Sequence, residues 1–192
     1  EPETIAQAAQ MLAQASSRVI YVGGGAMDAG AALVAIAERL QAPVLTTHTG
    51  KGAFPESHQL SLGCKMRQDA TAYEFLQSCD VALVVGCRLG HRTTDGGTLP
   101  LPSQIIQIDI DASSIGHARK TAIGIQADAS EALAALLEED LGEPKVVDPD
   151  NVQRVRLNQD YIASNPDSAQ MLEALRAVMP ADAVLVNDMT MV

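Results

Sequence analysis

Short apolar runs alternate with segments of helical periodicity along the first three quarters of the chain. The run at residues 81–85, VALVV, is followed directly by glycine, which is typical of a strand covered on both faces. Residues 29–41 repeat leucine, isoleucine and alanine at helical spacing, which indicates a helix. Strands buried on both faces and connected by helices form parallel sheets. The sequence therefore predicts an α/β fold, a doubly wound parallel sheet, over residues 1–142.

The C-terminal quarter differs in character from this alternating region. Residues 143–165 hold two prolines and mixed charge, and we interpret them as a linker that contains a polar helix at residues 152–163. A helix and one strand cannot form a sheet alone, so residues 166–192 are interpreted as the truncated start of a following domain. Strands are predicted at residues 18–22, 44–47, 81–85, 105–110, 122–126 and 183–186, and helices at residues 5–15, 29–41, 69–79, 130–141 and 166–178.

Charge and cysteine content exclude several classes of partner. The chain has 13 basic and 24 acidic residues, a net charge of −11, and no dense run of lysine or arginine. Because nucleic acids and anionic membranes require a basic surface, the sequence predicts neither partner. The three cysteines form no C-x-x-C pair and indicate neither disulfides nor a zinc site. Cys79 and Cys87, beside an apolar run, are interpreted as small buried hydrophobes, and we expect a reducing, cytoplasmic location.

A run of three glycines, Gly23 to Gly25, lies between the first predicted strand and the next helix. Glycine lets a ligand approach the backbone closely, and the start of a helix offers free N–H groups to a phosphate. The run departs from the G-x-G-x-x-G fingerprint, because Asp28 stands where the third glycine would be. Two interpretations therefore stay open here, a phosphate site and a tight turn without a ligand.

Charged residues follow two other predicted strands. Asp109 closes one strand, where a carboxylate can accept hydrogen bonds from a ribose hydroxyl, and Asp111 is a candidate cap for the following turn. Arg88, His91 and Arg92 indicate either a site for an anion such as a pyrophosphate or a solvated loop. The sequence contains none of the common hydrolase, metalloprotease or P-loop motifs. No catalytic residue and no metal ligand is therefore assigned.

Several short motifs follow one another in a recognisable order. They are VGGGA at residues 22–26, APVLTT at 42–47, GKGAFPESH at 50–58, DVALVVGCR at 80–88, IQIDID at 106–111 and ADA at 127–129. In this order they resemble the central domain of thiamine-diphosphate-dependent enzymes of the acetolactate synthase, pyruvate oxidase and benzoylformate decarboxylase group. The resemblance covers about residues 1–142, and residues 171–188 resemble the start of that family's C-terminal diphosphate-binding domain.

The resemblance implies a six-stranded, Rossmann-like parallel sheet placed between two catalytic domains of a homo-oligomeric lyase or transferase. In that family, an N-terminal domain supplies the glutamate that activates thiamine diphosphate. A G-D-G…N motif further along holds magnesium and the diphosphate. Neither feature is found in these 192 residues. We therefore expect the chain alone to be inactive, and its partners to be the N- and C-terminal catalytic domains of a parent 2-oxo acid decarboxylase or carboligase.

Some members of the family bind FAD or an adenine nucleotide in this domain. Residue by residue, the resemblance assigns cofactor binding to Gly23, Gly24, Gly25, Thr47, Arg88, Asp109, Ile110 and Asp128.

Two departures from the flavin-binding synthases argue against a tightly bound flavin. Residues 64–69, CKMRQD, stand where those synthases carry a Gly-Met-His-Gly-like stretch, and residues 89–92, LGHR, stand where they usually carry Phe-Asp-Asp-Arg. Two other functions remain open. The chain is alternatively a free-standing FAD- or NAD-binding oxidoreductase domain, or a structural spacer with a vestigial nucleotide pocket.

Overall fold

The structure is a computed structural model that describes residues 1–64, 70–145, 148, 150, 152 and 165–186. The chain divides into two compact units, residues 1–157 and residues 158–192. Every residue of the predicted site belongs to the first unit. Among the described residues, no helix has the length and apolar character that crossing a membrane requires.

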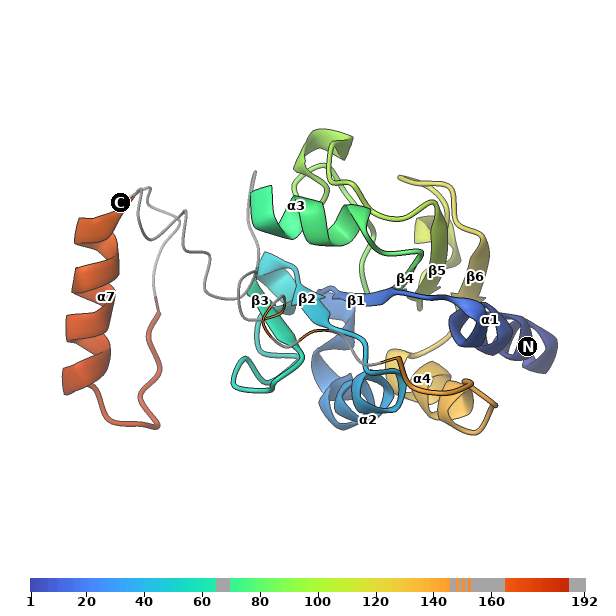
Figure 1. The fold of residues 1–192 in the computed structure, drawn as a ribbon, viewed down its shortest axis with the longest axis horizontal. Helices are drawn as coiled ribbons and strands as arrows, with labels where there is room; N and C mark the ends of the chain where they lie inside the picture. Colours follow the sequence, from blue (N-terminus) through green and yellow to red (C-terminus); the bar gives the residue numbers. More distant parts are fainter. Residues whose placement is uncertain (65–69, 146–147, 149, 151, 153–164, 187–192) are drawn as a thin grey trace. The chain divides into compact units, whose positions relative to one another are not determined.

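The first unit is built on a six-stranded sheet whose strands are all parallel, in the order β3-β2-β1-β4-β5-β6 (Figure 1). This arrangement confirms the predicted doubly wound, six-stranded fold. The strands are β1 (Arg18–Val22), β2 (Val44–Thr46), β3 (Ser61–Cys64), β4 (Val81–Val85), β5 (Gln104–Asp109) and β6 (Ile123–Gln126).

Helices cover both faces of this sheet, α3 on one face and α2 and α4 on the other (Figure 1). Short 3₁₀ helices follow four of the strands or their loops. The helices of the first unit are α1 (Pro2–Gln14), α2 (Gly30–Leu40), α3 (Ala70–Gln77) and α4 (Ala129–Leu137), and the 3₁₀ helices are η1 (Gly24–Ala29), η2 (His48–Gly50), η3 (Asp95–Gly97) and η4 (Ala112–Ser114).

Alternating side chains of each strand fill two aliphatic cores. In β5, Ile106 and Ile108 pack in the core beneath α1, α2 and α4, while Ile105 packs in the core beneath α3. Gln107 and Asp109 therefore point to the same face as Ile105, because side chains alternate along a strand. All five residues of β4 are buried, as the VALVV run predicts.

Three parts of the structure differ from the expectations. Strand β3 lies where no strand is predicted, and residues 183–186, where a strand is predicted, form none. Several predicted helices are shorter than expected, most clearly α4, which ends at Leu137. Residues 153–163 of the expected polar helix, the first residue of the expected helix at 69–79 and most of the CKMRQD segment lie outside the described residues.

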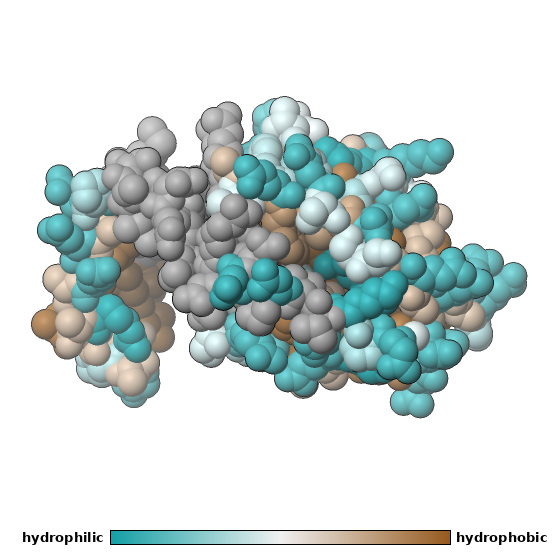
Figure 2. All heavy atoms as spheres, in the orientation of Figure 1, coloured by the Kyte–Doolittle hydropathy of each residue, from teal (hydrophilic) through white to brown (hydrophobic). Residues whose placement is uncertain are grey.

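The second unit contains one described helix, α7 (Pro166–Val178), which agrees with the prediction. Its larger apolar side chains and those of residues 184–186 are exposed. Figure 2 shows apolar residues on the surface of this unit.

Candidate functional site

The candidate site lies at the carboxyl ends of the parallel strands, where β1 and β4 are neighbours. The chain leaves β1 into α2, which covers one face of the sheet, whereas the loop after β4 packs Leu89 and Leu99 into the core of the other face. Such a divergence between neighbouring strands opens a crevice, and doubly wound proteins bind their ligands there.

The glycine turn after β1 packs directly on the end of β4. The N–H of Gly23 donates to the carbonyl of Val85 at 2.9 Å, and the N–H of Gly25 donates to that of Gly86 at 3.0 Å. A Cβ atom on Gly23 would overlap the Gly86 carbonyl, and one on Gly25 would lie 3.0 Å from the Gly86 Cα atom. Close packing between two backbones therefore accounts for glycine at both positions, and two of the turn's N–H groups are already used.

Gly24 and Thr47 meet the loop that follows β2. A Cβ atom on Gly24 would lie 3.2 Å from the Thr49 carbonyl oxygen. The buried Thr47 hydroxyl accepts a hydrogen bond from the Gly50 N–H at 3.0 Å and so caps η2. Thr47 thus shapes the loop, and the loop lies close against Gly24, so a bulky substitution at Gly24 would disturb packing as well as any ligand.

Arg88 follows β4 with its side chain exposed. Gly86 and Leu89, on either side of it, adopt positive φ angles of 57° and 52°. The Leu89 side chain is 2% exposed, so the core anchors the backbone just beyond the arginine. A leucine in this backbone conformation is costly and persists only where surrounding packing imposes it. The loop therefore holds Arg88 at the carboxyl edge in a defined backbone geometry.

Asp109, Ile110 and Asp111 form the end of β5. The buried Asp109 carboxylate accepts a hydrogen bond from the Asp111 N–H at 3.0 Å, and Ile110 is 72% exposed. Hydrogen bonds from the hydroxyl and N–H of Ser113 are the main causes that hold the pKa of Asp111 below its ordinary value, and Arg88 contributes in the same direction. Asp111 is thus a cap whose charge also lies within electrostatic reach of Arg88.

Asp128 begins α4 as its N-cap. Its Oδ1 atom accepts hydrogen bonds from the N–H groups of Ser130 at 2.8 Å and Glu131 at 3.3 Å. Helix N-termini leave such N–H groups without partners inside the helix, which is why aspartate is favoured there. The assigned site residues therefore share the carboxyl edge of the sheet, but the side chains of Thr47 and Asp128 already cap η2 and α4.

A residue that sequence reasoning did not single out connects two of these loops. Gln107 is 1% exposed, and its Nε2 atom donates to the carbonyls of Cys87 at 3.1 Å and Ser114 at 3.2 Å. Its Oε1 atom accepts from the Gly116 N–H at 2.9 Å. The available signal was one polar residue on the inner face of an apolar strand, IIQID, because buried amides are normally fully hydrogen-bonded.

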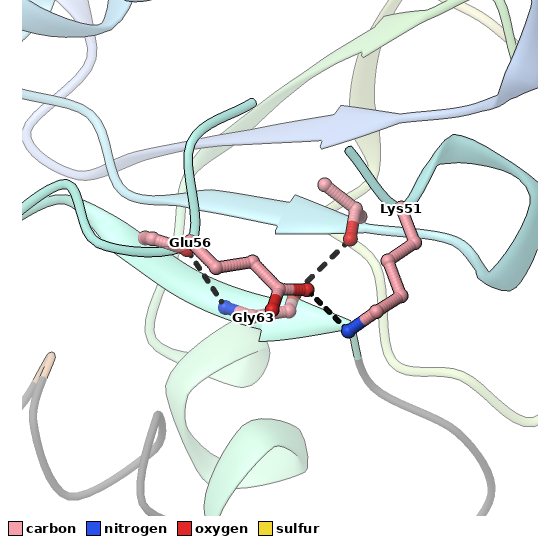
Figure 3. A network of polar contacts seen from close by, with 5 residues as sticks. Lys51, Glu56 and Gly63 are labelled. Carbon is pink, nitrogen blue, oxygen red and sulfur yellow. Dashed lines mark hydrogen bonds and ion pairs between the residues drawn. The ribbon is translucent and has the colours of Figure 1, made fainter. Parts of the chain in front are cut away.

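Lys51, another cation near this edge, is engaged elsewhere. Its Nζ atom pairs with Glu56 at 2.7 Å (Figure 3). The same view shows the backbone of Gly63, whose N–H donates to the Ser61 hydroxyl and whose carbonyl accepts from the Thr46 hydroxyl. Because the Lys51–Glu56 pair is solvent-exposed, it contributes little stability. Lys51 is therefore a weaker candidate than the exposed Arg88 to meet a phosphate.

The exposed and charged groups at this edge set which ligand chemistry it can meet. Among the described residues, no group of three or more histidine, cysteine, aspartate or glutamate side chains could hold a metal ion. The exposed Arg88, the buried Asp109 carboxylate and the exposed Ile110 offer a cation, a hydrogen-bond acceptor and an apolar surface. Because two N–H groups of the glycine turn already have partners, Arg88 would supply most of the attraction for a phosphate.

A groove of about 650 Å³ lies away from this edge, between α1 and the starts of β4, β5 and β6. Glutamines dominate its polar lining, and its one acid, Asp80, accepts hydrogen bonds from the N–H groups of Ser16 and Ser17. The groove therefore offers no unpaired charge and is separate from the candidate site.

The thiols predict a clear pattern of reactivity. Cys79 and Cys87 are buried, and burial raises the pKa of both, that of Cys79 to about 12, whereas Cys64 is partly exposed. Since the thiolate is the reactive form, a disulfide reagent at pH 8 should label at most one thiol in the native protein and all three in guanidinium chloride. Rapid native labelling of Cys79, located by peptide mass spectrometry, would contradict this packing.

Comparison with known proteins finds a family whose model matches most of the chain. The family model described as thiamine pyrophosphate enzyme, central domain, matches residues 5–136. A probable 2-ketoarginine decarboxylase of Pseudomonas aeruginosa is 32% identical over 192 residues, which are 98% of this chain and 34% of that protein.

Two further relatives match about 70% of the chain. The acetolactate synthase large subunit of Corynebacterium glutamicum is 40% identical over 138 residues, 70% of this chain and 22% of that protein. A probable sulfoacetaldehyde acetyltransferase of Rhizobium meliloti is 37% identical over 145 residues, 72% of this chain and 24% of that protein. The chain thus spans about a third or less of the length of these relatives.

Proposed function

This chain belongs to the central-domain family of thiamine pyrophosphate enzymes, and we propose that it is the non-catalytic centre of a larger thiamine-diphosphate-dependent lyase or transferase. The match over residues 5–136, which coincides with the six-stranded parallel sheet, carries this proposal. The names of the relatives include a decarboxylase, a synthase and an acetyltransferase, so a decarboxylating or carbon–carbon-joining reaction on a 2-oxo acid is the best-supported class for the parent.

In this proposal, the reaction takes place on domains outside the matched region. No step of the reaction is assigned to the described residues. The N- and C-terminal catalytic domains of the parent are the partners of this domain, in a cytoplasmic homo-oligomer. Three cysteines without a C-x-x-C pair support a reducing compartment.

An activity assay tests the non-catalytic role directly. The purified chain with thiamine diphosphate, magnesium and pyruvate should release no carbon dioxide above background, because neither a metal cluster among the described residues nor a G-D-G…N motif is present. A complete enzyme of the family, assayed in parallel, serves as the positive control. Decarboxylation that requires both the chain and thiamine diphosphate would refute the assignment.

The carboxyl edge supports a second role, the binding of an adenine nucleotide. Arg88 would meet a phosphate, the Asp109 carboxylate would accept a ribose hydroxyl, and Ile110 would offer apolar contact to the base. The competing role is a structural spacer with a vestigial pocket. The hydrogen bonds from Gly23 and Gly25 to the end of β4 favour the spacer, because they remove donors from the phosphate end.

Replacing Arg88 with alanine distinguishes these two roles. ADP affinity should fall about tenfold, or ~1.4 kcal/mol, because the arginine supplies the main charge for the phosphate. The melting temperature should not change, since the side chain is exposed. Lys120→Ala, an exposed cation that precedes β6 at the opposite edge of the sheet, is the matched control and should bind ADP as the wild type does.

Isothermal titration calorimetry measures the affinity of the wild type and of both variants for ADP and FAD. We expect ADP to bind at least as tightly as FAD. Absence of heat from either nucleotide on the wild-type protein would favour the spacer, and tight binding that survives Arg88→Ala would place the nucleotide elsewhere.

A further inference from the structure

One buried side chain, that of Gln107, hydrogen-bonds two separate loops of the candidate site. The loop after β4 carries Arg88, and the loop after β5 carries Asp111 and η4. The Gln107 carboxamide bonds the Cys87 carbonyl in the first loop and Ser114 and Gly116 in the second. Arg119 in the second loop also donates to the carbonyls of Gly97 and Leu99 in the first, but these lie well beyond Arg88, whereas Gln107 bonds the peptide group next to it.

The position of these bonds determines what they fix. Cys87 directly precedes Arg88, so the hydrogen bond from Gln107 holds the peptide group from which the arginine projects. The buried Leu89 holds the backbone on the other side. In the second loop, Ser114 and Gly116 follow the turn that Asp111 caps. The carboxamide therefore fixes the spacing between the cation of one loop and the acidic end of the other.

Both polar atoms of the Gln107 carboxamide have hydrogen-bond partners. The amide nitrogen donates to one carbonyl in each loop, and the amide oxygen accepts from an N–H in the second loop. At 1% exposure, water does not replace these partners. A residue that lacked any of these three functions would leave a backbone group without a partner in a buried place, which the loops would relieve by moving.

We propose that Gln107 is a positioning residue of the nucleotide site, which acts by holding Arg88 at a fixed distance from the Asp109–Asp111 turn. This inference rests on the proposed nucleotide-binding role and adds to it a residue that does not itself touch the ligand. Binding sites that need two groups at a defined separation depend on such supporting hydrogen bonds.

A double-mutant cycle tests the proposal. Gln107→Met keeps the length of the side chain and removes all three hydrogen bonds, and it should weaken ADP binding about five- to tenfold by calorimetry at a temperature where circular dichroism shows a folded protein. In the Arg88→Ala background, the same substitution should weaken binding less than about twofold, because Gln107 acts through Arg88. A role in folding alone would not produce this dependence on Arg88.

Three further variants separate positioning from stability. Ile106→Val, on the same strand but facing the opposite core, should lower the unfolding midpoint without changing ADP affinity. Gln107→Glu retains an acceptor for Gly116 and loses the donors to Cys87 and Ser114. It should weaken ADP binding at least as much as Gln107→Met does. Gln107→Asn, which keeps the amide without adding a charge but is one methylene too short to reach all three partners, provides the measurement if these variants do not fold.

The outcomes distinguish this inference from the nucleotide role itself. If the wild type binds ADP and Arg88→Ala weakens binding while the Gln107 variants bind normally, the positioning role is wrong and the nucleotide role stands. Equal losses from Gln107→Met in both backgrounds would also overturn it. If the wild type does not bind ADP, both fail together.

Discussion

Replacing Arg18 with methionine should lower the free energy of unfolding by about 3 to 5 kcal/mol. The Arg18 side chain is 3% exposed, and it donates to the carbonyls of Leu12 at 2.6 Å, Leu40 at 3.1 Å and Ala13 at 3.3 Å. These carbonyls lie at the C-terminal ends of α1 and α2, where helices leave carbonyls without partners and carry partial negative charge. Methionine fills similar space but leaves all three carbonyls unbonded.

Urea denaturation followed by circular dichroism measures this loss. Arg39→Met is the matched control, because Arg39 is only partly buried and donates one hydrogen bond, to the Gly142 carbonyl at 2.8 Å. We expect about 1 kcal/mol or less from the control. A loss below about 1 kcal/mol for Arg18→Met would mean that water or neighbouring groups satisfy the helix ends without the arginine.

The sheet was predictable because its central strands carry a strong physical signal. A run such as VALVV has no polar position, so it can only be buried on both faces, and the glycine after it marks the turn. Strand β3, at the edge, lacked this signal. It reads SLGC, its register with β2 shifts between Val44 and Leu45, and Gly63 adopts a φ of 77°. Edge strands need fewer apolar residues, so periodicity does not detect them.

The strand expected at residues 183–186 does not form, although its sequence carries the apolar signal that β3 lacks. Its sequence, AVLV, is apolar, but a parallel strand exists only beside another strand that completes its hydrogen bonds. Local sequence reports the tendency of a segment to be buried and carries no information about its neighbour. Most of its residues are accordingly exposed.

The candidate site was predictable in its location but less so in its roles. Parallel strands place the residues after Val22, Val85 and Asp109 at one edge, so their proximity follows from topology alone. Whether a given side chain is free for a ligand depends on hydrogen bonds that spacing does not reveal. Asp128 is an example, since it caps α4, and Gln107 shows the converse, a residue without a motif that contacts two loops of the site.

The glycine turn leads to the second large effect, which we expect from Gly86→Ala. Gly86 has a φ of 57°, and a Cβ atom there would lie 2.5 Å from the Ala26 nitrogen and the Gly25 carbonyl carbon. Both are backbone atoms of the turn after β1, so neither can move aside as a side-chain end would. The strained backbone and the steric overlap together should cost at least ~3 kcal/mol of unfolding free energy.

Two other glycines of the same loop separate these contributions. Gly97 has a φ of 91° and no heavy atom within 4 Å of an added Cβ, so Gly97→Ala should cost only the ~1 to 2 kcal/mol of backbone strain. Gly90 has neither a positive φ nor a close neighbour, and Gly90→Ala should change stability by less than about 0.5 kcal/mol. Urea denaturation of the three variants measures the series.

The order of the three losses decides what the glycine turn does. A Gly86→Ala loss well above that of Gly97→Ala, or a failure of Gly86→Ala alone to yield folded protein, would demonstrate that β4 and the turn after β1 are packed backbone to backbone. Because Gly86 lies two residues before Arg88, the same packing also sets where the arginine leaves the sheet. Equal losses for Gly86→Ala and Gly97→Ala would instead mean that the turn can separate from β4, which would free its N–H groups for a phosphate.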